Sequence, residues 1–275
     1  MTWTVMSVNT QHGGRLNDQF EPEDRWAGLV ELIRAEDPDV VLMQETGSWH
    51  DNRWTQHARA ERDLGMRVHL TRSPAGGGAA VAHRRDVPWL AKEDHHAVHM
   101  HAMTHLQLDI GAAFPLVVIS LHLDPFSAQL AAQQMQLAIA RVYRYGGLGI
   151  IGGDINHVPL GDPEPDWSAV HPYNRTSRTV GDPPRGNTMV AELAQRGGLT
   201  EVGGYLADLR GDPSLRRPTG HAGLCRVDWF LTTPALRPAV VDYRVVATAP
   251  HTDHDAIAMD IDLDKIDHTL TRKAS

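Results

Sequence analysis

Short apolar runs that end in polar side chains recur along this chain. Residues 150–153 form one such run, which delivers Asp154 and Asn156 at its end. Residues 40–43 form another, which delivers Gln44 and Glu45 at its end. Continuous apolar runs of this kind are typical of strands that are buried on both faces. Because residues i and i+2 of a strand point to the same face, Asp154 and Asn156 should emerge side by side where the sheet ends, a common place for ligands.

Periodicity predicts further strands and helices around these two runs. Continuous or alternating apolar patterns predict strands at residues 3–9, 114–122, 226–231 and 256–261. Helical spacing of apolar side chains predicts helices at residues 22–35, 128–145 and 189–195. Most of the predicted strands end in polar side chains.

Three other segments have a distinctive composition. Between His95 and Asp109, histidines alternate with apolar residues, which predicts one polar face of an antiparallel strand rather than a second metal site. Residues 160–187 are rich in Pro, Gly, Arg and Asp and predict a long surface excursion beside Asp154. Residues 49–72 combine arginine, histidine and tryptophan, so they form either a solvated helix or a cationic platform for a phosphorylated ligand.

Composition narrows the class of protein. The chain has 275 residues and a formal net charge of −8, and no linker-like stretch divides it. We therefore expect a single domain over residues 1–275, with about the last ten residues as a flexible tail. Cys225 is the only cysteine, which excludes an internal disulfide and a thiolate zinc site. Without a leader-like N-terminus or a membrane-length apolar run, a cytoplasmic monomer with no membrane span is expected.

Polar residues lie where predicted strands meet loops, although they are spread over the whole chain. They are Asn9, Glu45, His122, Asp154, Asn156, Asp253 and His254. Turn chemistry explains any one of these stretches, and a lone histidine is most often structural. Neither explanation accounts well for so many strand ends of the same kind.

The polar strand ends form an ordered set of motifs. These are Asn9, Gln44-Glu45, His122-Leu123-Asp124, Gly153-Asp154-Ile155-Asn156, Arg226-Val227-Asp228-Trp229-Phe230 and Thr252-Asp253-His254. The set resembles the endonuclease/exonuclease/phosphatase family, which has the DNase I-like fold, and it covers nearly the whole chain. The resemblance implies a four-layer α/β sandwich, in which two mixed, mostly antiparallel sheets lie face to face with helices outside. It also implies hydrolysis of phosphoesters with Mg²⁺ or Mn²⁺.

The resemblance places the metal ion at Glu45. Because Mg²⁺ prefers hard oxygen ligands and keeps several waters, one carboxylate helped by the amide oxygen of Asn9 would anchor the ion. Asp253 would assist the metal or the leaving group. Gln11 departs from the family pattern, since some relatives carry an aspartate two residues after the first asparagine. This departure argues against a second carboxylate-bound metal there.

The resemblance gives the other motif residues roles in hydrolysis. Asp154 would deprotonate or orient the attacking water, and Asn156 would hold that water or a phosphate oxygen. His254 and His122 would donate to the phosphorus-bound oxygens as charge develops on them. Asp228 would orient His254 in a carboxylate–imidazole pair.

Arginines outside the motifs indicate how a substrate is held. The chain has 26 basic and 34 acidic residues, and its loop arginines are scattered rather than gathered into one stripe. We expect Arg178 and Arg185, together with Asn156 and His122, to bind a phosphoester through few phosphate contacts. A nucleic-acid end, a short single strand or a small phosphoester would satisfy this expectation.

Nuclease-like hydrolysis of a phosphodiester, with a short footprint, is the function that the sequence favours. The alternatives are a phosphatase or phosphodiesterase that acts on a small-molecule, nucleotide or phospholipid-type substrate, and a family member that has lost catalysis and serves as a binding module. A zinc hydrolase is a weaker alternative, because the sequence contains no HExxH motif.

Overall fold

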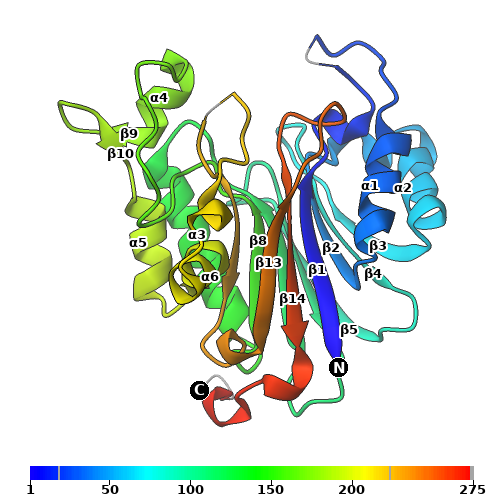
Figure 1. Cartoon of the computed structure of the whole chain (residues 1–275). Coiled ribbons are helices and arrows are strands. Elements are labelled where there is room, and N and C mark those ends of the chain that lie inside the picture. The colour runs from blue at the N-terminus through cyan, green and yellow to red at the C-terminus, as the bar shows by residue number, and fades with distance from the viewer. Residues whose placement is uncertain (18, 223, 273–275) are drawn as a thin grey trace.

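Two six-stranded sheets lie face to face at the centre of the molecule, and helices cover their outer faces (Figure 1). The computed structural model describes residues 1–17, 19–222 and 224–272. Within these residues the layers run helix, sheet, sheet, helix. The four-layer α/β sandwich expected from the sequence is confirmed.

The first sheet has the strand order β13-β14-β1-β2-β4-β3. Its strands are β1 (Thr2–Asn9), β2 (Val40–Gln44), β3 (Met66–Thr71), β4 (Ala79–Arg84), β13 (Val240–Val246) and β14 (Ala256–Asp262). Strand β1 runs parallel to β2, and the other neighbours are antiparallel. Asn9 pairs with Gln44 in the parallel ladder, so the polar ends of these two strands lie at one edge of the sheet.

The second sheet has the strand order β11-β12-β8-β7-β6-β5. Its strands are β5 (Trp89–His95), β6 (Met103–Leu108), β7 (Leu116–His122), β8 (Gly149–Asp154), β11 (Thr200–Glu201) and β12 (Asp228–Thr232). Only β7 and β8 are parallel among the pairings of this sheet that the structure describes. Asp154 lies opposite His122 on one side and Asp228 on the other, which places three motif residues in a row.

Helices pack on the outer face of each sheet. The α-helices are α1 (Trp26–Glu36), α2 (Asp51–Leu64), α3 (Ala128–Tyr143), α4 (Pro172–Arg178), α5 (Met189–Arg196) and α6 (Val202–Arg210). Short 3-10 helices are η1 (His12–Gly14), η2 (Gly47–His50), η3 (Pro213–Arg216), η4 (Arg237–Ala239), η5 (Leu263–Lys265) and η6 (His268–Leu270). Helix α1 packs its apolar stripe, which includes Leu29, on the first sheet, and α3 packs Met135 on the second. The helical spacing predicted for these two segments is therefore confirmed.

The core between the sheets depends on the glycines of β8. Fully buried members of this core include Val5, Leu42, Val118, Ile150 and Phe230. A Cβ atom on Gly152 would lie only 2.7 Å from Leu42 Cδ1 and from Phe230 Cδ1. A Cβ atom on Gly153 would lie 1.9 Å from the Leu121 carbonyl oxygen. The two glycines let neighbouring backbone and side chains approach the last residues of β8, and they fix where Asp154 emerges.

The surface excursion over residues 160–187 contains structure that its composition did not predict. It forms α4 and a hairpin of β9 (Thr179–Val180) and β10 (Arg185–Gly186). Near its start, Asp162 accepts hydrogen bonds from Arg226 Nε and Nη2, at 2.9 and 2.8 Å. The Arg226 side chain is fully buried and also binds Glu201 at 2.6 Å. A buried cation between two carboxylates thus ties the excursion to the start of β12 and of α6.

The prediction for the histidine-rich stretch was wrong. Of its five histidines, only His95 and His105 lie in strands, β5 and β6, whereas His96, His99 and His101 lie in the loop between them. His99 and His105 are fully buried rather than exposed on a polar face. Alternation along a sequence cannot reveal a reversal of chain direction that has no strong turn signal, and here the loop folds inward.

The segment after β14 passes beside the first residues of β1, where the Leu263 N–H donates to the Met1 carbonyl oxygen at 2.9 Å. Ile266 is packed into the core between the sheets, and η6 follows it. The expected flexible tail lies partly at residues 273–275, outside the described residues. None of the helices in the described part of the chain is both long and apolar enough to cross a membrane.

Buried neutral histidines should make the protein sensitive to acid. Burial lowers the pKa of His99 to about 3, and neither ring nitrogen has a hydrogen-bond partner in the described structure. In the unfolded chain this group titrates near 6.5, so the unfolded state binds protons preferentially as the pH falls below that value. The contribution of neutral His99 to the free energy of unfolding is therefore fully present above about pH 6.5. It is lost as the pH falls toward the pKa of His99 in the folded state. The loss at about pH 5 should be on the order of 1–2 kcal/mol for each fully buried histidine.

Urea unfolding at about pH 7 and pH 5 tests this effect, with His99→Leu as the comparison that removes one titrating ring. The variant should lose less stability between the two pH values than the wild type. An equal loss of unfolding free energy in both proteins would contradict the conclusion that His99 stays neutral in the folded state.

Candidate active site

The predicted motif residues converge where the two sheets meet at one edge. Strands β1 and β2 bring Asn9 and Glu45 from the first sheet, and β7 and β8 bring His122 and Asp154 from the second. The loop before β14 adds His254. Contacts of Asp154 with Asn9, His122 and His254 join the two sheets.

The Asp154 carboxylate is almost fully enclosed, with 3% of its side chain exposed. Asn9 Nδ2 donates to its Oδ2 atom at 3.2 Å, and the Asn156 backbone N–H donates to its Oδ1 atom at 2.9 Å. The same Oδ2 atom lies 3.4 Å from His122 Nε2 and 3.8 Å from His254 Nε2. Burial alone would raise the pKa of Asp154, but the two imidazoles outweigh it and the pKa is lowered. The carboxylate is therefore held ionised.

His254 lies between two carboxylates. Its Nδ1 atom is 2.9 Å from Asp228 Oδ2, while its Nε2 atom faces Asp154. Burial by itself would lower the pKa of His254, but Asp228 and Asp154 raise it well above the ordinary value. Asp228 is positioned by its cross-strand pairing with Asp154 and by the Thr219 hydroxyl, which contacts its backbone N–H at 3.0 Å. The pair has the geometry of a carboxylate that orients an imidazolium.

Glu45 faces a pocket of about 260 Å³, whose other lining residues include His12, Gly77, His101 and His122. Asn9 Nδ2 donates to Glu45 Oε1 at 3.1 Å, and the His12 backbone N–H donates to Oε2 at 2.9 Å. Burial would raise the pKa of Glu45, but His122 and these hydrogen bonds lower it overall. The residue has a φ of 60°, a left-handed conformation that is costly for a glutamate and that turns its carboxylate toward the pocket side of the strand end.

The donor set at Glu45 fits a hard divalent cation. Glu45 offers carboxylate oxygen atoms, whereas Asn9 directs Nδ2 toward Glu45 and its Oδ1 atom accepts from the Gln11 N–H at 2.9 Å, so the Asn9 amide would turn to present oxygen to a cation. Two protein ligands would leave most of an octahedral shell to water and substrate, as is usual for Mg²⁺. Ligand atoms of Asp154, Asp228 and His254 also lie within 4.8 Å of one another. We interpret that second group as an ion pair, because the Asp228–His254 hydrogen bond already uses the ligand atoms.

Asn156 and Arg178 form a buried clamp beside Asp154. Arg178 Nε donates to the Asn156 carbonyl oxygen at 2.9 Å, and Nη2 donates to Asn156 Oδ1 at 3.1 Å. Asn156 Nδ2 donates to the Leu123 carbonyl oxygen at 3.1 Å. The amide that the sequence assigned to water or phosphate therefore also holds the loops on both sides of the site.

Two predicted residues lie apart from this cluster. Asp253 is exposed next to His254, and its described side-chain contact is with the Thr252 hydroxyl at 3.4 Å. Arg185 is exposed on the hairpin, and no hydrogen bond or ion pair links its side chain to the cluster in the described part of the chain. Asp124, which shares a motif with His122, accepts from the N–H groups of Phe126 and Ser127 before α3 and thus has a structural role.

Sequence reasoning missed two residues that line the site. The His101 ring stacks on the His122 ring with a centroid distance of 4.7 Å, and burial lowers the pKa of His101 to about 4. His12 lies with its Nδ1 atom 3.7 Å from Glu45 Oε2. The histidine-rich composition near residue 101 was visible, but its interpretation as a strand face hid the contact with His122.

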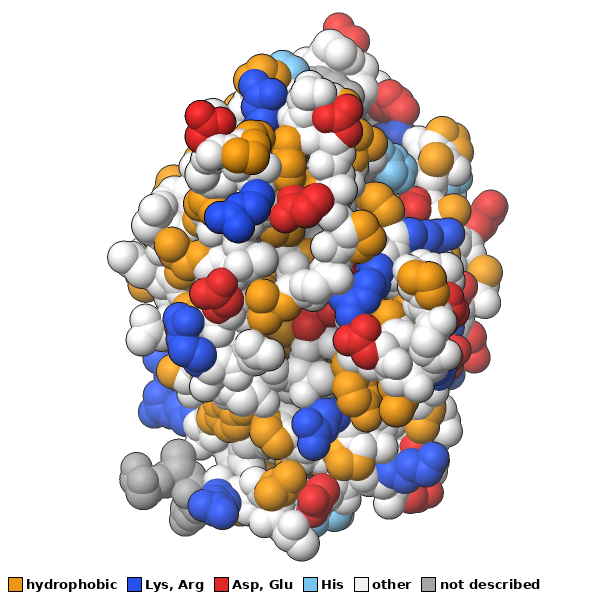
Figure 2. Space-filling model, turned by 60° about the vertical axis from the view of Figure 1, so that its left-hand side comes forward, with side chains coloured by type: hydrophobic (Ala, Val, Ile, Leu, Met, Phe, Trp, Pro, Cys, Tyr) orange, Lys and Arg blue, Asp and Glu red, His pale blue; other side chains and the backbone are white. Residues whose placement is uncertain are grey.

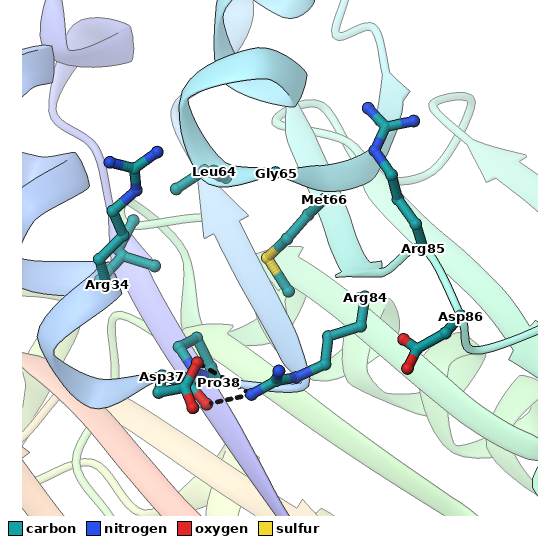
Figure 3. A pocket seen from close by; sticks show the side chains of 10 residues that line it. Arg34, Asp37, Pro38, Leu64, Gly65, Met66, Arg84, Arg85 and Asp86 are labelled. Carbon is teal, nitrogen blue, oxygen red and sulfur yellow. Dashed lines mark hydrogen bonds and ion pairs between the residues drawn. The ribbon is translucent and has the colours of Figure 1, made fainter.

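A larger pocket lies elsewhere, at the ends of α1 and α2. It measures about 350 Å³ and includes Arg34, Asp37, Arg84 and Asp86 in its lining. Figure 3 shows Arg84 paired with Asp37, and the Arg34 and Arg85 side chains on opposite sides of the pocket. The carboxyl ends of two helices face this hollow, and their dipoles disfavour an anion. None of the motif residues lines it, so the cluster at Asp154 remains the candidate active site.

Comparisons with known proteins found a family match that spans most of the chain. The model of the Endonuclease/Exonuclease/phosphatase family matches residues 6–254. A search of curated proteins found no significant match.

Several solved structures share the fold. TDP2 of D. rerio complexed with single strand DNA product has a TM-score of 0.66 at 17% identity, covering 95% of this chain and 99% of that one. ANGEL2, described as a 2′,3′-cyclic phosphatase, has a TM-score of 0.67 at 15% identity, covering 94% and 95%. An endonuclease/exonuclease/phosphatase from Beutenbergia cavernae DSM 12333 has a TM-score of 0.62 at 18% identity, covering 94% and 71%.

The Asp228–His254 pair predicts a measurable titration. In the metal-free protein, the His254 imidazole should titrate well above its ordinary value, because two carboxylates stabilise its charged form. Asp228→Asn should bring the pKa of His254 back toward the ordinary value. NMR titration of the histidine ring protons, with His254→Gln to assign the signal, measures both. Asp253→Asn serves as the control and should shift the pKa of His254 less than Asp228→Asn does. If the pKa of His254 were unchanged in Asp228→Asn, the pairing of these two residues would be contradicted.

Proposed function

The chain belongs to the endonuclease/exonuclease/phosphatase family and is a phosphoester hydrolase, and we propose that it hydrolyses a phosphodiester with the aid of Mg²⁺ or Mn²⁺. The attacking water is activated by Asp154. One observation carries this proposal: an ionised, almost fully buried carboxylate lies between two imidazoles and two asparagine groups. A purely structural carboxylate does not need two imidazoles aimed at the same oxygen atom.

Asp154 Oδ2 accepts a proton from the attacking water, whose oxygen forms the new bond to phosphorus as the bond to the leaving oxygen breaks. A carboxylate with a lowered pKa is a weak base in the resting state. Phosphate oxygens that accept from His122 and His254 would draw these imidazoles away from Asp154. The pKa of Asp154 would then rise while the water is in place, which links substrate binding to proton removal.

His254 and His122 stabilise charge on the phosphorus-bound oxygens. His254 enters as an imidazolium, since Asp228 holds its Nδ1 side and leaves Nε2 to donate. Arg178 keeps Asn156 and the adjoining loop in register with Asp154. A divalent cation at Glu45 and Asn9 would supply Lewis-acid stabilisation of phosphate and leaving-group charge.

A short stretch of nucleic acid is the substrate class that we favour. The fold neighbour TDP2 of D. rerio was solved with a single strand DNA product. On the face drawn in Figure 2, Lys and Arg side chains are interspersed with Asp and Glu side chains and form no continuous stripe. Long-duplex binding needs many adjacent phosphate contacts, so this surface favours a strand end or a short single strand.

A small phosphoester is the second candidate. ANGEL2, another neighbour, is described as a 2′,3′-cyclic phosphatase. The pocket of about 260 Å³ beside Glu45 is large enough for a small ligand group. A nucleotide or a similar compound therefore belongs in the first activity screen.

The proposal predicts metal-dependent activity that Asp154 controls. With added Mg²⁺ or Mn²⁺, the protein should hydrolyse at least one of single-stranded DNA, RNA, a nucleotide or a small phosphodiester, and a chelator should abolish turnover. Asp154→Asn should lower turnover by about two to four orders of magnitude, the usual scale for loss of a general base. Glu45→Gln should mainly raise the metal concentration required for half-maximal rate. Initial rates over a metal titration measure all three effects.

Arg196→Ala provides the matched control, because Arg196 is exposed on α5 away from the site. Its rate should equal that of the wild type. A folded Asp154→Asn protein with near-normal turnover on the preferred substrate would overturn the assignment of this reaction centre.

The short footprint predicts a weak dependence on salt. On a single strand, each phosphate contact adds about 0.7 to the slope of log affinity against log salt, so one to three contacts give a slope of about 1–2. If Arg185 is one of these contacts, Arg185→Ala should reduce the slope by about 0.7, while Arg196→Ala should leave it unchanged. Michaelis constants measured from low to moderate salt supply the slope. A slope of about six or more on long duplex DNA would contradict the short footprint.

A further inference from the structure

Two aromatic rings are exposed beside the active site without a function in the chemistry described above. Phe126 is 61% exposed and Tyr173 is 52% exposed. Their rings meet edge to face, with a centroid distance of 5.4 Å and an interplanar angle of 80°. Exposed apolar side chains are common singly, but a paired aromatic surface beside a reaction centre is a recognised means of ligand binding.

Hydrogen bonds connect the segments that carry the two rings to the loop after Asp154. Phe126 follows the His122 motif, and its N–H donates to Asp124 Oδ1 at 2.9 Å. The Asp124 carbonyl oxygen in turn contacts His157 Nε2 at 3.1 Å, in the loop after Asp154. Tyr173 lies on α4, the helix that ends with Arg178, and Arg178 binds Asn156. The two rings therefore flank the Asn156 side of the cluster, whereas Glu45 and His101 lie on the pocket side.

Hydrogen bonds fix the backbone that carries each of the two rings. Asp124 accepts from two successive N–H groups, and the Ser127 hydroxyl accepts from the Leu130 N–H at the start of α3. On the other element, the Tyr173 carbonyl oxygen accepts from the Thr176 hydroxyl at 2.9 Å. A pre-organised aromatic surface loses little conformational entropy when a flat ligand stacks on it.

We propose that Phe126 and Tyr173 form a stacking platform for an unpaired nucleobase next to the reacting phosphate. This inference rests on the proposed function, because the phosphate must occupy the Asp154 cluster for the neighbouring base to reach the platform. A base presents one flat face, which two rings can cover, and stacking on aromatic side chains tolerates any base. A lipid surface would require a wider apolar patch than this pair provides. The platform thus selects single-stranded or unpaired nucleic acid over phosphodiesters that lack a base.

Binding measurements test the platform separately from catalysis. Two labelled oligodeoxynucleotides of roughly eight residues share one backbone, but one carries bases throughout and the other has abasic residues at its central positions. Their dissociation constants are measured by fluorescence anisotropy with Asp154→Asn protein, which leaves the strands uncut. The base-bearing strand should bind about 5- to 100-fold more tightly, the range expected for stacking of one base.

Substitutions in the Asp154→Asn background locate the source of that preference. Adding Phe126→Ala or Tyr173→Ala should remove most of the preference, and adding Tyr173→Phe should retain it because the ring remains. Trp89→Ala is the matched control, since Trp89 is an exposed aromatic residue at the start of β5 and is not one of the motif residues. Thermal unfolding of each variant identifies any loss that comes from misfolding, and the Tyr173→Phe comparison remains informative if Tyr173→Ala does not fold.

The outcomes separate this inference from the proposed function. Equal binding of both strands would overturn the platform, even if the wild type cleaves them. A base preference that Phe126→Ala and Tyr173→Ala remove supports the platform, even if the wild type cleaves neither strand and the proposed function fails. Binding to phosphatidylcholine vesicles that is lost in Phe126→Ala, with no base preference, would assign the rings to a lipid surface and overturn the proposal.

Discussion

The burial of the Asp154 carboxylate is the constraint on which the rest of the site depends. An ionised carboxylate can be withdrawn from water only if hydrogen bonds and opposite charge replace its hydration. Here the replacements come from β1, from the end of β7, from the loop after β8 and from the segment before β14. The buried charge of Asp154 therefore brings together groups from both sheets, including Asn9 near the start of the chain and His254 before β14. The fold is needed to keep this carboxylate ionised.

The sequence predicted the central strands because they are continuous apolar runs that end in polar residues, whereas the sandwich followed from the resemblance of the ordered motifs to the family. The runs before Glu45 and Asp154 needed no knowledge of their neighbours to be recognised. Other features depend on tertiary contacts. Asp124 was indistinguishable in the sequence from an active-site carboxylate, although it accepts backbone N–H groups before α3. His101 could be assigned to the site only once the loop before β6 was seen to fold onto His122.

The two sides of the proposed reaction centre differ in chemistry. On one side, the Glu45 carboxylate and the imidazoles of His12, His101 and His122 surround a small polar pocket. On the other side, Arg178 and Asn156 separate Asp154 from an exposed aromatic pair. A phosphodiester has two unlike substituents on its phosphorus, and a site with two unlike sides can fix which of them leaves. The register of β7, β8 and β12 sets this asymmetry, since it places His122, Asp154 and Asp228 in one row.

The excursion over residues 160–187 is held near both of its ends by buried arginines. Arg226 donates hydrogen bonds to Asp162, and Arg178 donates hydrogen bonds to Asn156. The segment between these anchors carries Tyr173 and most of α4, yet the sheets do not depend on it for their pairing. Evolution can therefore lengthen, shorten or exchange this interior while the catalytic groups keep their positions, much as variable loops change on a constant immunoglobulin framework. Such a modular segment offers a simple route by which one hydrolytic centre could pass from one phosphoester to another over its history.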